Sequence, residues 1–240
     1  MKAKAPTSSP EDVADRRLRR SRRTRNALAT AAVELVLERG LGAVTVEAIA
    51  ERADVARRTF SRHFAGKEDA ALDFVRADGD RINALLRARP ADEPPLLAYR
   101  RAVQDWLTDP EDPPRHVRPP MRRLLALLDT EPTLFAAYQR IRLDAQAESV
   151  RVIADRIGGT DGDGGRGRAA IVVDAAAGVL TAALRLWLRA GADHPERPDR
   201  PEEPDRPEHG PGAAELAEVV ERAYDALLGE AARAASHAAG

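Results

Sequence analysis

The stretch that decides the fold is residues Thr24–Leu72, TRNALATAAVELVLERGLGAVTVEAIAERADVARRTFSRHFAGKEDAAL. Its first part repeats apolar residues at steps of three and four positions, which predicts a helix from about residue 16 to Arg39. Gly40 then acts as a typical helix stop. Thr45 is a typical N-cap for a second short helix, which is expected to end near Ala53.

A third short helix, Ala56–His63, is predicted after a turn, with Phe60 and Phe64 on the face that it buries. This spacing predicts a helix-turn-helix, in which the last helix offers its other face to the major groove of DNA. The residues expected on that outward face are Arg57, Arg58, Ser61 and Arg62. Guanidinium groups suit bidentate contact with guanine, so its three arginines are the candidates for base reading. The same groups also bind phosphates, and the sequence leaves the assignment of each open.

Charge is distributed unevenly along the chain. The formal net charge is −1 over 240 residues, but residues 1–66 carry 14 Lys/Arg against 8 Asp/Glu, and residues 67–240 carry 24 against 31. Seven arginines lie within Arg16–Arg25. A basic head on an acidic body predicts a polyanionic partner, because contacts from Lys and Arg to phosphates release condensed counterions. The alternative is a solvated, disordered tail that binds nothing.

The whole stretch resembles the DNA-binding domain of the tetracycline-repressor (TetR) family of transcriptional regulators. The resemblance rests on the ERG helix stop, T-V-x-x-I-A in the second helix, V-x-x-x-T-F-x-x-H-F around the third, and G-K-E after it. It covers about the first third of the chain. It implies that Thr45, Thr59, His63 and Lys67 hold the phosphate backbone of double-stranded DNA.

Two positions depart from the family pattern. Ala56 stands where the family often has Ser or Thr, and Ser61 where it often has Tyr, so the contact of that tyrosine is in doubt here. The nearby arginines and the run Arg16–Arg25, acting as an arm on the minor groove or the backbone, are expected to compensate. For His63, a structural role against the domain core is an equal alternative. The predicted DNA-binding residues are Arg22, Arg23, Arg25, Thr45, Arg57, Arg58, Thr59, Ser61, Arg62, His63 and Lys67.

The chain divides into an arm, a head and a larger body. Residues 1–15 are predicted to form a disordered arm and residues 16–66 the helix-turn-helix domain. Beyond Gly66 no period-2 stretch is long enough for a strand, so the fold is predicted to be all-α, with residues 67–240 as a helical ligand-binding and dimerisation domain. Its expected helices span residues 67–88, 94–108, 116–129, 131–157, 167–190 and 212–235. The Pro- and charge-rich segment 191–212 is expected to be an exposed connector.

Large side chains on the apolar faces of the C-terminal helices are predicted to line a concave pocket. The predicted pocket residues are Tyr99, Trp106, Leu125, Leu128, Phe135, Tyr138, Arg185 and Trp187. Ordinary core packing is the alternative for each apolar member. Arg185 is the most informative, because it interrupts the run VLTAALRLWL, where a charge must face solvent, a partner or an anionic ligand.

The spacing of Leu, Pro and Ala in Arg123–Ala136, with Trp187 late in the next-to-last helix, is similar to a TetR subgroup with an acyl-CoA-like ligand-binding domain, including the mycofactocin-linked regulators. That similarity implies a small organic effector, acyl-CoA-like in kind. The Ala- and Gly-rich stretch Ala175–Ala183 and the apolar face of the last helix predict a four-helix dimer interface. Two heads on one homodimer then predict a palindromic DNA site.

Several classes of site are not expected. The chain has no cysteine, which excludes disulfides, thiolate metal sites and cysteine nucleophiles. Its five histidines show no metal-ligand spacing, and the acidic turn Asp161–Gly164 has Val172 where a calcium loop needs Glu. With no catalytic motif, no cofactor or enzyme activity is expected. No uninterrupted apolar run reaches the roughly 18 to 20 residues of a membrane span, so a soluble, cytoplasmic protein without a membrane partner is expected.

The sequence therefore predicts a ligand-responsive, homodimeric transcriptional repressor. One alternative is a constitutive or architectural DNA-binding protein without a small-molecule effector. Another is a helical enzyme or protein-interaction module whose basic head is incidental. The effector, the operator and the regulated genes are not readable from the residues.

Overall fold

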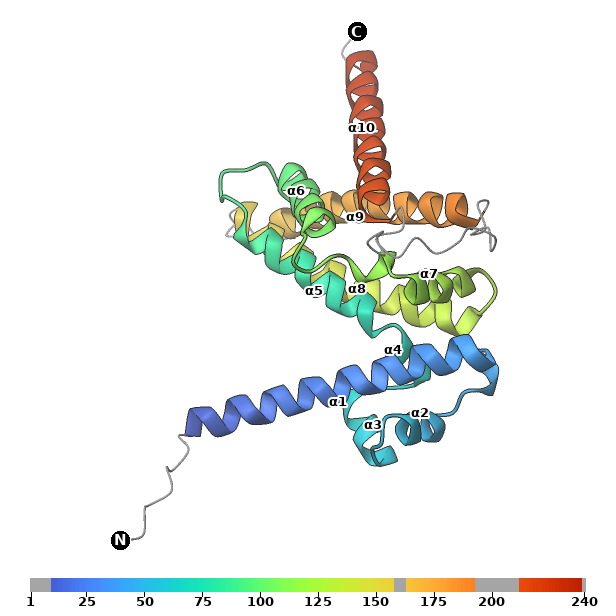
Figure 1. Ribbon diagram of the computed structural model, residues 1–240. Helices are drawn as coiled ribbons and strands as arrows, with labels where there is room; N and C mark the ends of the chain where they lie inside the picture. The colour runs from blue at the N-terminus through green and yellow to red at the C-terminus, as the bar shows by residue number, and fades with distance from the viewer. Residues whose placement is uncertain (1–9, 158–162, 193–211, 239–240) are drawn as a thin grey trace.

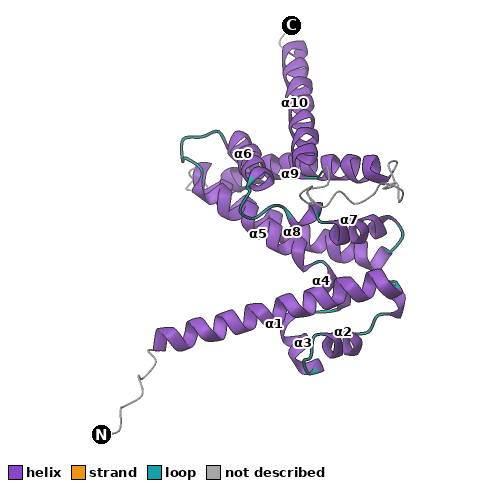
Figure 2. Cartoon of the chain, viewed as in Figure 1, coloured by secondary structure: helices purple, strands orange, loops and turns teal. Residues whose placement is uncertain are grey.

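A computed structural model describes residues 10–157, 163–192 and 212–238. Every regular element in these ranges is helical (Figures 1 and 2). The long elements are α1 (Pro10–Arg39), α2 (Val46–Arg52), α3 (Arg57–His63), α4 (Lys67–Ala71), α5 (Asp73–Ala88), α6 (Pro95–Thr108), α7 (Pro119–Ala126), α8 (Pro132–Ile157), α9 (Asp163–Ala192) and α10 (Ala213–Ala238). Short 3-10 turns lie at η1 (Leu41–Ala43), η2 (Arg115–Val117) and η3 (Leu127–Asp129). The all-α prediction is therefore confirmed.

Helix α1 is longer than the sequence predicted. It begins at Pro10, so residues 10–15, expected in the disordered arm, are helical; the rest of that arm lies outside the described residues. A proline at the first helical position already has the φ that a helix needs, and no glycine or further proline interrupts the run to Arg39. At 1.5 Å per residue the helix is about 45 Å long. Its N-terminal part projects beyond α2 and α3 (Figure 1).

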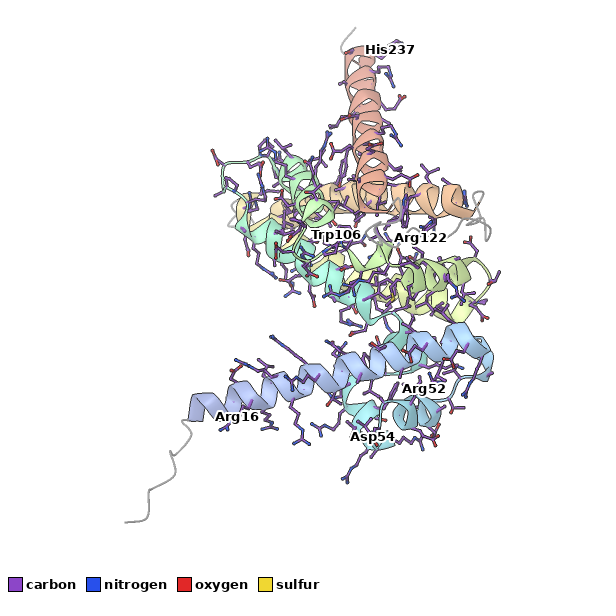
Figure 3. The ribbon with its side chains drawn as sticks, in the orientation of Figure 1. Arg16, Arg52, Asp54, Trp106, Arg122 and His237 are labelled. Carbon is purple, nitrogen blue, oxygen red and sulfur yellow. The ribbon has the colours of Figure 1, made fainter. Side chains whose placement is uncertain are left out.

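The head consists of α1, α2 and α3. The hydroxyl of Thr45 accepts a hydrogen bond from the backbone N of Ala48 at 3.1 Å, which is the N-cap that the sequence predicted. Asp54 has φ +54° in the turn between α2 and α3, a left-handed conformation that Asp tolerates better than most residues. Phe60 and Phe64 are buried under α3, with ring centroids 5.7 Å apart. The predicted helix-turn-helix geometry is thus present (Figure 3 labels Arg52 and Asp54 on it).

Two predicted helices of the body are divided. The helix expected over 67–88 breaks at Leu72, whose ψ of 14° is not helical and whose side chain is fully buried between α4 and α5. The helix expected over 116–129 consists of η2, α7 and η3. Its α-helical part starts only at Pro119, because Pro119 and Pro120 lack the N–H that a continuing helix needs, whereas the first turn leaves such groups unpaired in any case.

The apolar core forms two clusters, and the first of them crosses the predicted domain boundary at residue 66. Leu28 and Phe60 of the head belong to the same cluster as Leu124 of α7 and Leu134 of α8. The second cluster joins α5, α6, α8, α9 and α10 around Trp106 and Trp187. Since α7 and α8 share a core with α1, a shift in the body can be transmitted to the head through side-chain packing.

Helix α9 is the longest apolar element. By length and composition, Gly164–Ala190 would suffice to cross a membrane, which the sequence reading missed because Asp174 and Arg185 interrupt the apolar run. One face of α9 packs against α8 and α10, as expected of a core helix. Helix α10 crosses α9 and projects outward from the body (Figure 1). The connector expected over 191–212 and the turn at 161–164 lie almost wholly outside the described residues.

Candidate DNA-binding surface and ligand pockets

Helix α3 presents its predicted outward residues to solvent. Arg57, Arg58, Ser61 and Arg62 are all exposed, on the side opposite to the buried Phe60. Arg57 Nε lies 2.9 Å from Glu47 Oε1, across the turn from α2. Within the described ranges, Arg58 and Arg62 form no ion pair. The face therefore offers two unengaged guanidinium groups and one that must first leave a carboxylate.

The residues implied to hold phosphates fall into different environments. Thr45 is exposed at the start of α2, and its hydroxyl can still donate while it accepts from Ala48 N. Thr59 and His63 are half-buried on α3. Burial, and after it the positive charges of Arg25 and Arg62, lower the pKa of His63. His63 is thus neutral at pH 7 in the free protein, so its imidazole would contact a phosphate as a neutral hydrogen-bond donor.

Arg25 lies inside the head instead of on an arm. Its Nε donates to Asp73 Oδ1 at 3.0 Å, and its Nη1 donates to the carbonyl oxygen of His63 at 2.9 Å. The guanidinium also lies over the ring of Phe64, 4.5 Å from its centroid. These contacts bind α1 to the end of α3 and to the start of α5. The prediction that Arg25 binds DNA is therefore replaced by a structural role for this side chain.

Lys67 is engaged in a similar way. Its Nζ donates to the carbonyl oxygens of Leu41 and Val44, at 2.7 and 3.0 Å. These carbonyls belong to the loop between α1 and α2, so Lys67 fixes the position of that loop. An ammonium group has three N–H donors, and two of them are used here. The structure shows Lys67 as a brace for the loop, with at most one donor left for a phosphate.

The arginines at the N-terminal end of α1 lie along the projecting part of the helix (Figure 3 labels Arg16 there). Arg22 and Arg23 are exposed, as is the preceding stretch 14–20. Arg19 pairs with Asp15 one turn earlier, at 2.7 Å. An exposed pair of this kind contributes little to stability. The basic run is therefore a helical extension of the head, and it offers its charge to solvent.

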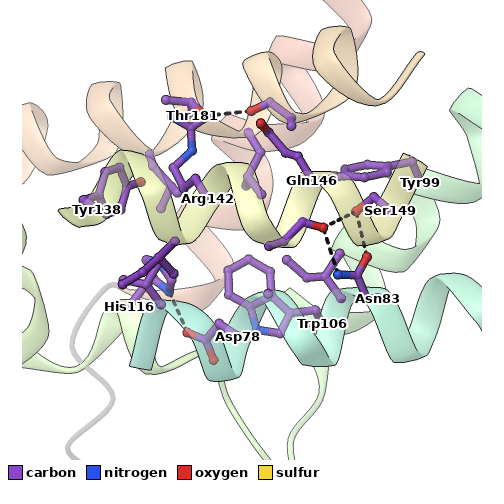
Figure 4. Close-up of a pocket in the computed structure, with 18 residues that line it drawn as sticks. Asp78, Asn83, Tyr99, Trp106, His116, Tyr138, Arg142, Gln146, Ser149 and Thr181 are labelled. Carbon is purple, nitrogen blue, oxygen red and sulfur yellow. Dashed lines mark hydrogen bonds and ion pairs between the residues drawn. The ribbon is translucent and has the colours of Figure 1, made fainter. Parts of the chain in front are cut away.

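The body contains a pocket of about 70 Å³ between α5, α6, α8 and α9 (Figure 4). Of the predicted pocket residues, Tyr99, Trp106 and Tyr138 line it. The space is several times what a single water molecule requires. Its wall also includes Asp78, His116, Arg142 and Gln146, three of which the sequence reading did not propose.

Asp78 and His116 form a buried pair in this wall. His116 Nδ1 lies 2.6 Å from Asp78 Oδ2, while Arg115 Nη1 lies 3.2 Å from Asp78 Oδ1. Burial favours the protonated carboxyl group, but the hydrogen bonds and positive charge from His116 and Arg115 outweigh it and lower the pKa of Asp78. The imidazole also packs edge-on against the rings of Phe74 and Trp106. Asp78 thereby fixes the orientation of the ring that faces the pocket.

The sequence does contain a signal for Asp78. It lies on the apolar stripe of α5 that includes Val75 and Ile82, where a carboxylate must be paired. Its partner His116 is 38 positions away in a 3-10 turn, and nothing in the local pattern connects the two residues.

A second pocket of about 260 Å³ lies farther toward the C-terminal end of α9. Its lining contains five of the predicted pocket residues: Leu125, Leu128, Phe135, Tyr138 and Arg185. Trp187 lines neither pocket. It is buried, and the guanidinium of Arg122 lies 4.5 Å from the centroid of its ring. Core packing, the alternative that the sequence left open, therefore explains Trp187.

All three tyrosines of the chain are buried, and two of them line the first pocket. Burial raises the pKa of Tyr99 to about 12, against a smaller opposing effect of the hydrogen bond with Ser149. Burial likewise raises the pKa of Tyr138 and Tyr224. Between the ordinary tyrosine pKa of about 10 and these raised values, the folded protein keeps protons that the unfolded chain loses. The free energy of unfolding is therefore expected to fall as the pH rises above about 10.

Tyrosinate absorbance during an alkaline titration measures this directly. We expect no ionisation near pH 10 while the circular dichroism stays native, and then a steep rise that coincides with unfolding. The urea-unfolded protein, titrated in parallel, is expected to ionise with the ordinary pKa of about 10. Reversible ionisation near this pH in the folded protein would contradict the burial of the three phenols.

Comparison with known proteins places this architecture. Residues 28–71 match the sequence profile described as "Bacterial regulatory proteins, tetR family". The chain is 38% identical over 185 residues to the HTH-type transcriptional regulator TcmR of Streptomyces glaucescens, covering 74% of this chain and 79% of that protein.

Solved structures share the fold at low sequence identity. The fatty acid degradation regulator FadR from Bacillus halodurans superposes with a TM-score of 0.50 at 13% identity, over 93% of this chain and 97% of the other. NalD of Pseudomonas aeruginosa, described as the secondary repressor of the MexAB-OprM multidrug efflux pump, gives a TM-score of 0.45 at 23% identity, over 85% and 97% of the two chains.

Proposed function

Because the chain belongs to the TetR family of bacterial regulatory proteins, we propose that it is a ligand-responsive repressor of transcription that binds a palindromic operator as a homodimer. The observation that carries the proposal is the exposed arginine face of α3. It stands on a helix held by buried Phe60 and Phe64, so its side chains project from a rigid support. A helix inserted in the major groove with such a face can read guanine edges. We further propose that the protein acts in the cytoplasm.

Helices α9 and α10 are proposed as the dimer interface. Ile171 is 72% exposed and Leu186 is 57% exposed on α9, and Leu228 is 41% exposed on α10. Large apolar side chains at such exposure on neighbouring helices are typical of a surface that a partner covers. A two-fold axis through this surface pairs the two α3 helices, and their half-sites are then expected about 34 Å apart, one turn of DNA.

The pockets are proposed to control the spacing of the two heads. His116 lies in η2, which leads directly into α7, and α7 packs against α1. A ligand that displaces the ring of His116 would therefore shift a helix that shares a core with the head. Only a ligand with higher affinity for the spacing that does not fit the operator can release the DNA. The acyl-CoA-like effector implied by the sequence stays a prediction.

Footprinting on the DNA beside the protein's own gene tests the proposal. We expect a protected palindrome and release on addition of the effector. A protected palindrome that no metabolite releases would favour the constitutive DNA-binding alternative. Binding without sequence preference at any salt concentration would favour an architectural protein, and no binding at low salt would contradict both.

The helical extension of α1 gives a separate, quantitative prediction. Replacing Arg22 and Arg23 by Gln is expected to leave the free energy of unfolding unchanged, because both side chains are exposed. If each arginine neutralises one phosphate, the slope of log K against log salt decreases by about 0.9 per contact, or by three to four in the dimer as an order of magnitude. Titration of labelled operator at several salt concentrations measures the slope.

The matched control is the double replacement of Arg166 and Arg168 by Gln. These two arginines are exposed on α9 and lie outside both pockets, and the change removes the same charge. We expect this control to leave the slope nearly unchanged. Equal slopes for the Arg22/Arg23 variant and the wild type would show that the extension does not contact DNA.

A further inference from the structure

The two pockets adjoin each other. Tyr138, Thr181 and Leu184 line both of them, so the spaces meet at these three side chains. Tyr138 belongs to α8 and the other two belong to α9. The pocket with Trp106 is called here the inner chamber, and the pocket with Arg185 the outer chamber.

The lining residues follow stripes on two helices. On α9 they run from Ala177 in the inner chamber to Arg189 in the outer chamber, at steps of three and four residues. On α8 they run from Phe135 in the outer chamber to Ser149 in the inner one. The helices thus line one space in opposite directions. At 1.5 Å per residue, the α9 stripe alone is about 18 Å long.

The inner chamber holds an unpartnered donor. Trp106 is 1% exposed, and its indole Nε1 is buried without a hydrogen-bond partner among the described residues. A buried N–H without an acceptor is costly, and native structures rarely leave one unless something else satisfies it. In Figure 4, Trp106 lies between α5 and α8, close to His116 and Asp78. A ligand with an acceptor oxygen at this end would pair the indole N–H.

The outer chamber has a cationic rim. Arg185 and Arg189 are exposed and line it, and neither forms an ion pair with any described residue. Asp129 is the one carboxylate in the same lining, so an excess of positive charge remains. Phe135, 37% exposed, lies at the same rim and provides apolar surface beside the arginines.

The junction of the chambers carries positive charge as well. The guanidinium of Arg142 lies 5.7 Å from the centre of the Tyr138 ring and lines the inner chamber. Burial raises the pKa of Tyr138, while Arg142 and Arg185 oppose that effect, which is consistent with Tyr138 standing between the two arginines. The phenol therefore stays neutral and can contact a ligand body that passes from one chamber to the other.

We propose that the two chambers form one binding site for an elongated, largely apolar organic anion, with its acidic group at Arg185 and Arg189 and an acceptor oxygen, such as a ketone, at Trp106 Nε1. The proposal rests on the proposed function in treating this molecule as the effector. The binding site itself is a claim about the isolated protein and needs no DNA.

Three probe compounds separate the two ends of the site. An acetylnaphthoic acid carries a ketone at one end of a fused aromatic body and a carboxylate at the other. Acetylnaphthalene lacks the carboxylate, and ethylnaphthoic acid lacks the ketone. Binding is measured by isothermal titration calorimetry on the full chain. We expect the first compound to bind about tenfold or more tightly than either of the others.

Variants assign each preference to a side chain. Replacing Arg185 and Arg189 by Gln is expected to remove the advantage of the carboxylate and to leave acetylnaphthalene binding unchanged. Replacing Trp106 by Phe keeps a ring but removes the N–H, and it is expected to remove the advantage of the ketone. Trp187→Phe is the matched control for Trp106→Phe, since Trp187 is equally buried and lines neither chamber. Arg166→Gln with Arg168→Gln is the control for the two rim arginines.

The outcomes distinguish the site from the function. If the carboxylate advantage survives Arg185→Gln with Arg189→Gln, or if all three compounds bind equally, the proposed site is wrong, even when the operator footprint is intact. If Trp106→Phe does not fold, the rim variant alone still decides the outer end. If binding follows the proposed pattern but no compound of this class alters operator binding, the site stands and its role as an effector site fails.

Discussion

Replacing Arg58 by alanine is expected to weaken binding of the operator dimer site by about 2 to 6 kcal/mol, because each of two heads loses a bidentate contact of about 1 to 3 kcal/mol. Arg58 is exposed on α3, and within the described ranges it pairs with no carboxylate. The wild-type side chain therefore reaches DNA without first breaking an internal contact. Its removal is expected to change the free energy of unfolding by less than about 0.5 kcal/mol.

Fluorescence anisotropy with labelled operator and with a scrambled sequence of the same length measures this prediction. The loss is expected to be larger on the operator than on the scrambled DNA, because a base contact carries sequence preference and a phosphate contact does not. Arg57→Ala is the informative comparison. Arg57 must leave Glu47 before it binds DNA, so its removal is expected to cost less. Unchanged operator affinity and unchanged selectivity in both variants would sink the assignment of base reading to α3.

The head of the molecule could be predicted well because its signals are local. Thr45 is a cap that acts three residues onward, and Phe60 and Phe64 are one helical turn apart, so a short window of sequence contains the whole pattern. The start of α1 could not be predicted in the same way. An exposed arginine-rich helix has no apolar stripe to indicate it, and composition alone favoured a disordered arm over residues 10–15.

The roles of Arg25 and Lys67 depend on distant partners. Asp73 is 48 positions from Arg25, and the carbonyl oxygens that Lys67 binds are 23 and 26 positions away. Within a run of seven arginines, the sequence does not indicate which one turns inward. The same limit applies in the body, where His116 meets Asp78 only after folding.

The pocket was predicted as a set of side chains but not as a shape. Apolar periodicity correctly placed Tyr99 and Phe135 on inward faces, yet it could not show that they line different chambers. Trp187 satisfied the same pattern and is core, since periodicity reports burial and gives no information about empty space. Arg185 was the better signal, because a charge within an apolar run calls for an explanation wherever it points.

Replacing Arg25 by Met is expected to lower the free energy of unfolding by about 2 to 4 kcal/mol, somewhat less than for a fully buried ion pair because the arginine is partly exposed. The change leaves Asp73, whose side chain is 13% exposed, without its ion-pair partner. It also removes the donor to the carbonyl of His63 and the cation above Phe64.

Arg23→Met is the matched control for Arg25→Met. It removes an exposed arginine two positions away on the same helix, and it is expected to leave stability unchanged and to reduce only the salt dependence of DNA binding. Urea denaturation of both variants separates the two roles, and Arg25→Lys is expected to recover only part of the loss, because an ammonium group cannot reproduce the fork that meets Asp73 and His63 together. If Arg25→Met unfolds at the wild-type urea concentration while its operator binding loses salt dependence as Arg23→Met does, then Arg25 contacts DNA and its internal contacts contribute nothing to stability.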